Sequence, residues 1–226
     1  MHTLSVIIPT LNEEDQLTAT VRLARAVPEV NEIIVVDGGS SDGTTTIGKQ
    51  LDCRVLSTVP SRGGQMRLGA SLAAGDVVVL LHADTWLPAD AGSAIAQCLR
   101  SSEVVGGGFR KTFRERHLLR IGARFRSTLL FHLRGPILGD QAIFVRREIL
   151  ERIGGVPDIP LMEEFELCRK LREVGRLKLS NATVSTSMRR FNKLGIARTY
   201  FRMGHVMLKY CFGARPEELV RLYDTP

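Results

Sequence analysis

Long apolar runs are missing from this sequence of 226 residues. No stretch approaches the roughly 20 apolar residues that a helix needs to cross a bilayer, so the sequence predicts no membrane-spanning helix. The first strand-like run begins at Leu4, which leaves no room for a signal peptide. We therefore expect a cytoplasmic protein.

Cysteine is also scarce, and the four cysteines lie far apart without a CxxC pair or a histidine at zinc-site spacing. This argues against a disulfide framework and a zinc site, and favours reduced structural thiols. Low-complexity runs, internal repeats and Pro/Gly/Ser-rich linkers are absent too. With 44% hydrophobic and 24% charged residues, the composition is that of a globular protein, and we expect a single domain over residues 1–226.

The positive charge is concentrated in one segment rather than spread over the chain. The net charge is +7, and within residues 110–134 eight Lys or Arg residues face a single acid, Glu115. Such a local patch does not predict a nucleic-acid-binding protein. The apolar residues within it suit an interfacial helix on anionic lipid at the inner membrane face or on a partner surface, and they also suit a packed helix with a solvated basic face. Both interpretations stay open.

Strands and helices alternate along the first half of the chain. Buried strands are predicted at 4–8, 33–36, 55–59 and 77–81, and helices at 13–27, after the turn 37–43, and at 62–74. Asn12 is a good N-cap for the first helix. Four apolar strands alternating with helices indicate an α/β fold of three layers, with a mostly parallel sheet covered on both faces.

The pattern changes after a helix that Pro88 is predicted to open. The later elements are strands at 106–113, 142–146 and 177–186 and a helix at 163–174. Polar residues follow directly after the early strands, at Asn12, Asp37, Asp42 and Asp84. Ligands of such sheets bind beyond the carboxyl ends of the strands, so this placement predicts a functional site.

Two motifs suggest the chemistry of that site. In DGGSSDGT, which begins at Asp37, glycines such as Gly38 bring the backbone close to a ligand and the carboxylate faces hydrogen-bond donors, although the string is also good turn chemistry. In LLHADT, Asp84 is suited to hold Mg²⁺ or Mn²⁺ against a diphosphate. His82 is either a second metal ligand or a hydrogen-bonding partner at the strand end.

Further polar groups are predicted to join the site. Three acids in the first turn of a helix, within MEEFE from Met162, include candidates for a general base, and they also stabilise the helix dipole. Arginine side chains are suited to donate to phosphate, and amide or carboxylate groups to bind hydroxyls. The candidates are Arg62, Gln65, Asp140, Gln141, Arg189 and Arg190.

Seven segments in order resemble the motif series of family 2 glycosyltransferases with the Rossmann-like GT-A fold. They are SVIIPTLNEE, IIVVDGGSSDGT, RGGQMRLGA, LLHADT, GDQAIFVRR, LMEEFEL and SMRRF. The match is closest to a small-protein subgroup described as selenodomain-associated or arsenosugar-biosynthesis transferases. The resemblance implies a nucleotide-binding half over residues 1–100 and an acceptor-side half over residues 101–226.

The resemblance also implies roles for individual residues. Pro9, Asn12 and Glu13 would line the nucleoside pocket, Asp37 would meet the base, and Asp42 and Arg62 would lie near the ribose and phosphates. Asp84 matches the last carboxylate of the DxD metal motif, Glu163 and Glu164 match the acidic pair whose second member is the general base, and Arg189 and Arg190 would lie near the diphosphate. His82 departs from the first aspartate of DxD, and Glu164 stands where aspartate is commoner.

The sequence thus predicts an inverting glycosyltransferase that uses a nucleotide-sugar donor and a divalent cation to modify an unidentified hydroxyl, on a small molecule or a lipid phosphate. Glu164 would accept the proton and Arg190 would stabilise the departing phosphate. Two alternatives remain. One is a nucleotidyltransferase, although PTLNEE stands where those enzymes usually carry a phosphate loop. The other is a non-catalytic nucleotide-binding or membrane-surface protein on the same fold.

Overall fold

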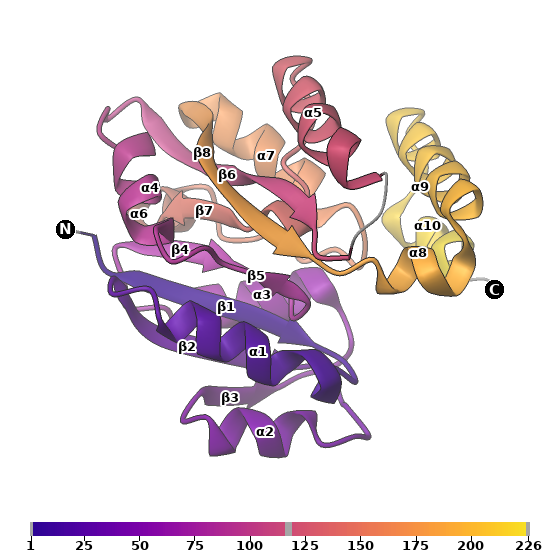
Figure 1. Ribbon diagram of the computed structural model, residues 1–226. Helices are drawn as coiled ribbons and strands as arrows, with labels where there is room; N and C mark the ends of the chain where they lie inside the picture. The colour runs from indigo at the N-terminus through magenta and orange to yellow at the C-terminus, as the bar shows by residue number, and fades with distance from the viewer. Residues whose placement is uncertain (1, 116–118, 225–226) are drawn as a thin grey trace.

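One twisted sheet runs through the computed structural model, which describes residues 2–115 and 119–224 (Figure 1). Over these residues the sheet has eight strands in the spatial order β3-β2-β1-β4-β7-β6-β8-β5. Along the chain the strands are β1 (Leu4–Thr10), β2 (Val30–Asp37), β3 (Arg54–Ser57), β4 (Val77–Leu80), β5 (Thr85–Trp86), β6 (Val104–Phe113), β7 (Ile143–Arg146) and β8 (Arg176–Thr186).

Parallel pairing predominates in this sheet. Strands β3, β2, β1 and β4 are all parallel, and β6 is parallel to β8. The exceptions are β7, which is antiparallel to both β4 and β6, and the short β5, which is antiparallel to β8. This topology confirms the predicted α/β fold with a mostly parallel central sheet, and the β4–β7 pairing joins the two predicted halves within it.

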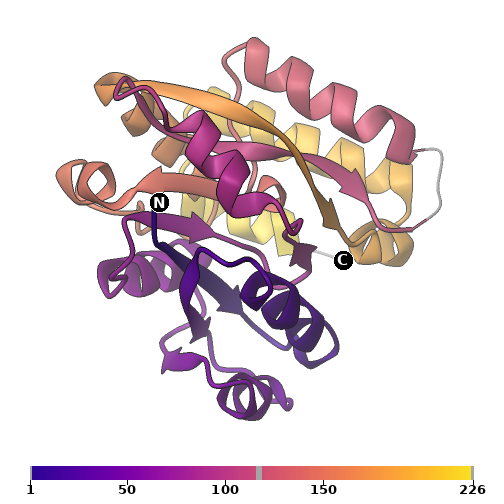
Figure 2. The same ribbon diagram turned by 60° about the vertical axis from the view of Figure 1, so that its left-hand side comes forward.

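Helices cover both faces of the sheet (Figures 1 and 2). They are α1 (Glu14–Arg25), α2 (Thr44–Gln50), α3 (Arg62–Ser71), α4 (Ala91–Cys98), α5 (Leu119–His132), α6 (Arg147–Arg152), α7 (Glu163–Val174), α8 (Arg189–Leu194), α9 (Ile196–Cys211) and α10 (Pro216–Asp224), with a 3₁₀ turn, η1, at Gly139–Gln141. Within the described residues, each of them is too short or too polar to cross a bilayer.

Two apolar cores lie on opposite faces of the sheet because side chains alternate along each strand. In β1, Val6 packs into the core under α1 and α4, whereas the next residue, Ile7, packs into the core under α3 and α7. Both side chains are fully buried. Continuous apolar runs such as this one are typical of parallel strands that are covered on both sides, and they give the three layers predicted from the sequence.

Three expectations about element ends and extent are corrected. Asn12 is not an N-cap: α1 is preceded by Glu13 and has no side-chain cap, because the Asn12 Oδ1 instead accepts a 2.9 Å hydrogen bond from the Ser41 amide. Helix α4 begins at Ala91 rather than at Pro88, because residues 89–90 form a turn in which the Ala91 amide donates to the Pro88 carbonyl at 3.0 Å. The chain after Thr186, for which no structure was predicted, forms α8, α9 and α10.

The basic segment 110–134 divides between two elements. Its first residues complete β6 and its later ones form α5, while residues 116–118 lie outside the described part of the chain.

All four cysteines are free thiols, as predicted.

Candidate active site

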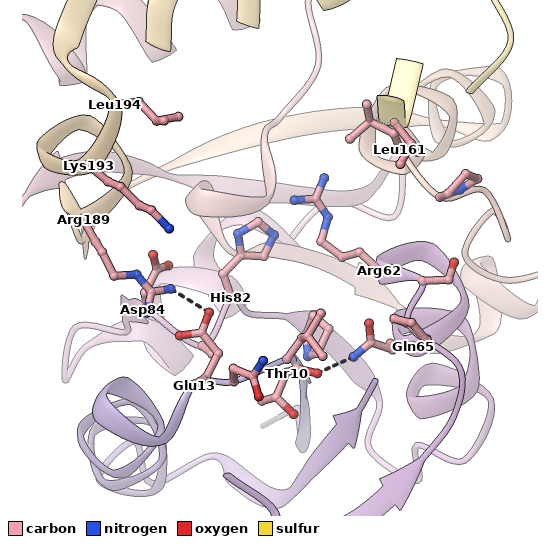
Figure 3. A pocket seen from close by; sticks show the side chains of 18 of the residues that line it. Thr10, Glu13, Arg62, Gln65, His82, Asp84, Leu161, Arg189, Lys193 and Leu194 are labelled. Atoms are coloured by element: carbon pink, nitrogen blue, oxygen red, sulfur yellow. Dashed lines mark hydrogen bonds and ion pairs between the residues drawn. The ribbon is translucent and has the colours of Figure 1, made fainter. Parts of the chain in front are cut away.

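A cavity of about 890 Å³ opens beyond the carboxyl ends of β1 and β4 (Figure 3). Helices α3, α8, α9 and α10 and the segment before α7 also contribute to its wall. Side chains from both halves of the chain therefore reach one space. The predicted site residues that line the cavity are Pro9, Asn12, Glu13, Arg62, Gln65, His82, Asp84 and Arg189.

The other predicted site residues do not line the cavity. They are Asp37, Gly38, Asp42, Asp140, Gln141, Glu163 and Glu164. The side chain of Arg190 lies outside the described part of the structure. The C-terminal helices contribute Lys193, Leu194, Arg202 and Val220 to the wall, which the sequence analysis did not identify because it assigned no structure to that region.

Asp37 holds the glycine-rich loop together instead of facing the cavity. Its Oδ2 accepts hydrogen bonds from the amides of Gly39, at 2.9 Å, and Ser40, at 2.8 Å. Its Oδ1 accepts another from the Thr10 hydroxyl at 3.2 Å, and the residue is almost fully buried. Because these contacts occupy both oxygens, Asp37 fixes the loop after β2 rather than offering a free carboxylate to a ligand in this conformation.

Asp42 and Gln65 also act on the backbone around the cavity. Asp42 accepts hydrogen bonds from the Thr44 amide at 3.0 Å and the Glu14 amide at 3.2 Å, which ties α2 to α1. The buried Gln65 amide donates to the carbonyls of Thr10 and Val36, at 2.8 and 2.7 Å, so α3 is fastened to the ends of β1 and β2.

Arg62, which lines the cavity, contacts two buried acids at the start of α7. The Arg62 Nε donates to Glu163, and its second terminal nitrogen lies 3.5 Å from the Glu164 Oε1. Glu163 has no exposed surface and Glu164 very little. Burial alone raises the cost of ionising both, so a shared guanidinium is what stabilises two adjacent carboxylates here.

The two acids differ in protonation because their neighbours differ. Burial would raise the pKa of the Glu164 carboxyl, but Arg62, the His82 ring and the Gly139 amide outweigh it and hold that pKa well below its usual value. For Glu163, burial and the adjacent Glu164 charge raise the pKa despite the hydrogen bond from Arg62. Glu164 is therefore the member of the pair that ionises more readily, and its ionised form is able to accept a proton.

Gly139 is a site residue that the sequence analysis passed over. Its amide donates a 3.1 Å hydrogen bond to the Glu164 Oε1. A Cβ at this position would fall within 3.0 Å of both the Glu164 carboxylate and the His82 ring. The sequence signal was present in GDQAIFVRR, but it pointed to the two polar residues that follow, not to the glycine.

Those two polar residues are engaged elsewhere. Asp140 forms a 2.6 Å ion pair with Lys111 from β6. The buried Gln141 donates to the Phe109 carbonyl at 3.0 Å and accepts from the Leu138 amide at 3.2 Å. Together they position the turn that carries Gly139.

Asp84 and His82 follow β4 and line the cavity (Figure 3). The His82 Nε2 lies 3.6 Å from the Glu164 Oε1, just beyond hydrogen-bonding distance. The structure thus brings the end of β4 and the start of α7 together, although they are about 80 residues apart in sequence. An ion pair of 2.7 Å between Glu13, directly before α1, and Arg189 of α8 lies beside Asp84 (Figure 3).

The polar side chains that line this cavity fit a divalent cation that takes some of its ligands from the protein and others from a phosphate group. The His82 Nε2 and the Glu13 Oε2 are buried and have no hydrogen-bond partner among the described residues. No cluster of three or more His, Cys, Asp or Glu residues within 2–115 and 119–224 is arranged to hold a metal by itself. Mg²⁺ commonly binds one or two carboxylates and takes its other ligands from phosphate and water, so Asp84 and His82 fit that kind of partial shell.

Residues 5–154, about two thirds of the chain, match the family described as Glycosyl transferase family 2. This chain belongs to that family. The match includes Asp37 and Asp84, and it ends before Glu163, Glu164 and Arg189. Membership in glycosyl transferase family 2 confirms the broader part of the predicted resemblance.

Similar proteins agree with the family assignment. The undecaprenyl-phosphate 4-deoxy-4-formamido-L-arabinose transferase of Yersinia pestis is 24% identical over 163 residues, which cover 66% of this chain and 50% of that protein. The chain thus spans about half the length of the curated relatives it matches.

Solved structures share the fold. Glucosyl-3-phosphoglycerate synthase from Mycobacterium tuberculosis, in complex with Mn²⁺, UDP and glucosyl-3-phosphoglycerate, has a TM-score of 0.59 and 22% identity, and the match covers 82% of this chain and 70% of that one. The same synthase with Mn²⁺ and UDP-glucose has a TM-score of 0.59 and 21% identity over the same shares. At these identities the likeness establishes the GT-A type of fold.

Proposed function

We propose that this protein is an inverting, metal-dependent glycosyltransferase that moves a sugar from a nucleoside-diphosphate donor to a hydroxyl group. The observation that carries the proposal is the contact of Glu164 with Arg62 and His82, two residues that line the cavity together with Asp84. Such a transfer needs a ligand for the metal ion, a positively charged side chain that binds phosphate, and a candidate base. These groups come from three different elements. The reaction takes place within one domain, with the donor held mainly by residues 1–100.

The donor's nucleoside would lie against Pro9, Asn12 and Glu13, and its phosphates against Arg62 and Arg189, all of which line the cavity. The solved relatives that bind UDP and UDP-glucose support a uridine nucleotide as the first donor to test. Asp37 and Asp42 contribute by fixing the adjacent loop, since their carboxylates bond to its backbone. Arg190 keeps its predicted role near the diphosphate.

Asp84 and His82 would hold Mg²⁺ or Mn²⁺. When bound, the cation neutralises charge that develops on the leaving diphosphate. The Mn²⁺ in the complexes of the solved relatives supports this choice.

Glu164 would accept the proton of the acceptor hydroxyl. As that oxygen attacks the anomeric carbon from the face opposite the diphosphate, the bond from carbon to phosphate oxygen breaks and its electron pair leaves with the nucleotide. The Gly139 amide and Arg62 hold the carboxylate in place for this step. The configuration at the sugar carbon inverts because one displacement occurs.

The acceptor's hydroxyl belongs to a small molecule or to a lipid phosphate. The Yersinia relative, whose name places its sugar on undecaprenyl phosphate, supports the lipid-phosphate choice. We also propose that the chain belongs to the small-protein subgroup that its seven motifs resemble.

Release of nucleoside diphosphate from a panel of nucleotide sugars and acceptors, with Mn²⁺ present, tests the proposal. We expect turnover with at least one donor and a loss of about 100-fold or more in the Glu164→Gln variant, because the amide accepts no proton. The matched control is Glu166→Gln, in the same helical turn but on its exposed side, where the carboxylate pairs with Arg169. Nucleotide binding without turnover of any donor, or a fully active Glu164→Gln variant, contradicts the assignment.

A further inference from the structure

Large apolar side chains are exposed mainly in two segments at one end of the molecule. Twelve large hydrophobic residues are exposed among those described, and seven of them lie in 125–133 or 201–212. All of the exposed phenylalanines are in this group: Phe125, Phe201 and Phe212, with 69%, 78% and 83% of their surface exposed. Concentrated exposure of this kind marks an interaction surface rather than scattered surface residues.

Helix α9 presents its exposed apolar residues as one stripe. Phe201, His205, Leu208 and Phe212 follow one another at intervals of four, three and four residues, which places them on one helical face. The Phe201 and His205 rings are stacked, with centroids 6.2 Å apart. The opposite face, which includes Val206, packs against α10 and the segment before α7. The stripe is therefore not the side that holds α9 to the protein.

The charge around these segments is of one sign. Residues 189–216 contain seven Lys or Arg and residues 116–139 contain five, and neither range contains Asp or Glu. Since the whole chain carries +7, the rest of it is net negative. Helices α5 and α9 lie on the same side of the molecule in both views (Figures 1 and 2), so the two basic ranges flank one region.

We propose that the exposed face of α9, together with residues 125–133, seats this protein on an anionic lipid surface. Aromatic and aliphatic side chains on one helical face with basic residues beside them are what an interfacial helix requires. Each Lys or Arg near an anionic leaflet adds attraction that falls away within a Debye length. A second copy of the chain fits this surface less well than lipid does, because a symmetric dimer would place two basic surfaces against each other.

The proposed membrane-binding surface lies next to the cavity. Helices α8 and α9 carry Arg189, Lys193 and Arg202 on the cavity wall, so a protein resting on α9 has its cavity close to the lipid headgroups. The proposal extends the predicted membrane contact of residues 110–134 to a helix that the sequence analysis did not identify, and it does not depend on the chemistry of the site.

Co-sedimentation of the full chain with vesicles tests the proposal. Vesicles of phosphatidylcholine alone are compared with vesicles that also contain phosphatidylglycerol, at low and at high salt. We expect binding to the anionic vesicles that weakens with salt. The Phe201→Ser/Phe212→Ser variant should partition about 100-fold less, because two aromatic side chains no longer enter the interface. Both residues are exposed, so circular dichroism and the melting temperature should not change.

Matched controls separate this surface from exposure or charge in general. Leu23→Ser/Val59→Ser removes two exposed apolar side chains elsewhere and should bind like the wild type. Lys209→Glu should weaken binding more than Lys49→Glu, which changes the same charge on α2. Failure of the wild type to sediment with anionic vesicles overturns the proposal. Sedimentation of the double variant equal to that of the wild type also overturns the proposal. So does a wild-type oligomer that the double substitution dissociates, because the stripe would then be a protein interface.

Discussion

Replacement of Gly139 by alanine perturbs the candidate active site without substituting any of its charged residues. The new Cβ would come within 3.0 Å of both the His82 ring and the Glu164 carboxylate. Both contacts are made by the ends of side chains, which are able to move. We therefore expect the free energy of unfolding to fall by only about 1–2 kcal/mol, the lower part of the range for overpacking.

The activity should fall much further than the stability. A shift of roughly 1 Å at a reacting group is enough to lower a rate by about 100-fold. The hydrogen bond from the Gly139 amide to Glu164, at 3.1 Å, sets the position of the carboxylate, and the added methyl group displaces it. We predict a reduction of kcat/KM by about 100-fold, measured as release of nucleoside diphosphate with the donor identified by the panel above.

The control for this variant is Gly204→Ala in α9. No atom lies within 4 Å of a Cβ built there, so this change should leave activity intact and stabilise the helix by up to about 1 kcal/mol. A Gly139→Ala enzyme with wild-type kcat/KM would refute the assignment of Glu164 and its turn to the reaction centre. Loss of stability greater than about 4 kcal/mol in urea would show that the turn is a folding element instead.

Other variants test the packing and the thiols. Arg62→Met should destabilise the protein by about 3 kcal/mol in urea denaturation, because the buried Glu164 carboxylate loses its cationic partner, and adding Glu164→Gln should restore much of the loss. Phe109→Ala, at a fully buried position, should cost about 3–5 kcal/mol, and a smaller loss would mean that the core relaxes around it. A thiol reagent should label the exposed Cys211 quickly in the native protein, whereas burial raises the pKa of Cys168 to about 11 and should protect it until the chain unfolds. Equal labelling rates would contradict this difference.

Much of the fold follows from local pattern. The helix predicted at 163–174 has those bounds in the structure, and the early strands appear within three residues of their predicted starts. Buried parallel strands are continuous apolar runs, which makes them easy to identify. The C-terminal helices were missed for the opposite reason. Helix α9 carries large apolar residues on its exposed face as well as its buried one, so the periodicity does not show which face packs.

Part of the cavity lining could be predicted from the sequence, whereas the contacts that individual side chains make could not. Asp84, His82 and Arg62 line one cavity. Whether a carboxylate faces a ligand or its own loop depends on local backbone conformation, and Asp37 bonds to its own loop. The contribution of Gly139 depends on how closely two distant segments approach, which no spacing in the sequence records.

Binding of UDP by calorimetry, with and without Mn²⁺, tests most directly whether Asp84 and His82 form a shared metal and diphosphate site. We predict that Mn²⁺ tightens UDP binding by about tenfold or more in the wild type, since phosphate oxygens complete a partial shell. The Asp84→Asn variant should lose this dependence, whereas Asp90→Asn, beside the start of α4, should keep it. UDP binding that is indifferent to Mn²⁺ in the wild type, or equally Mn²⁺-dependent in Asp84→Asn, would contradict the proposed site.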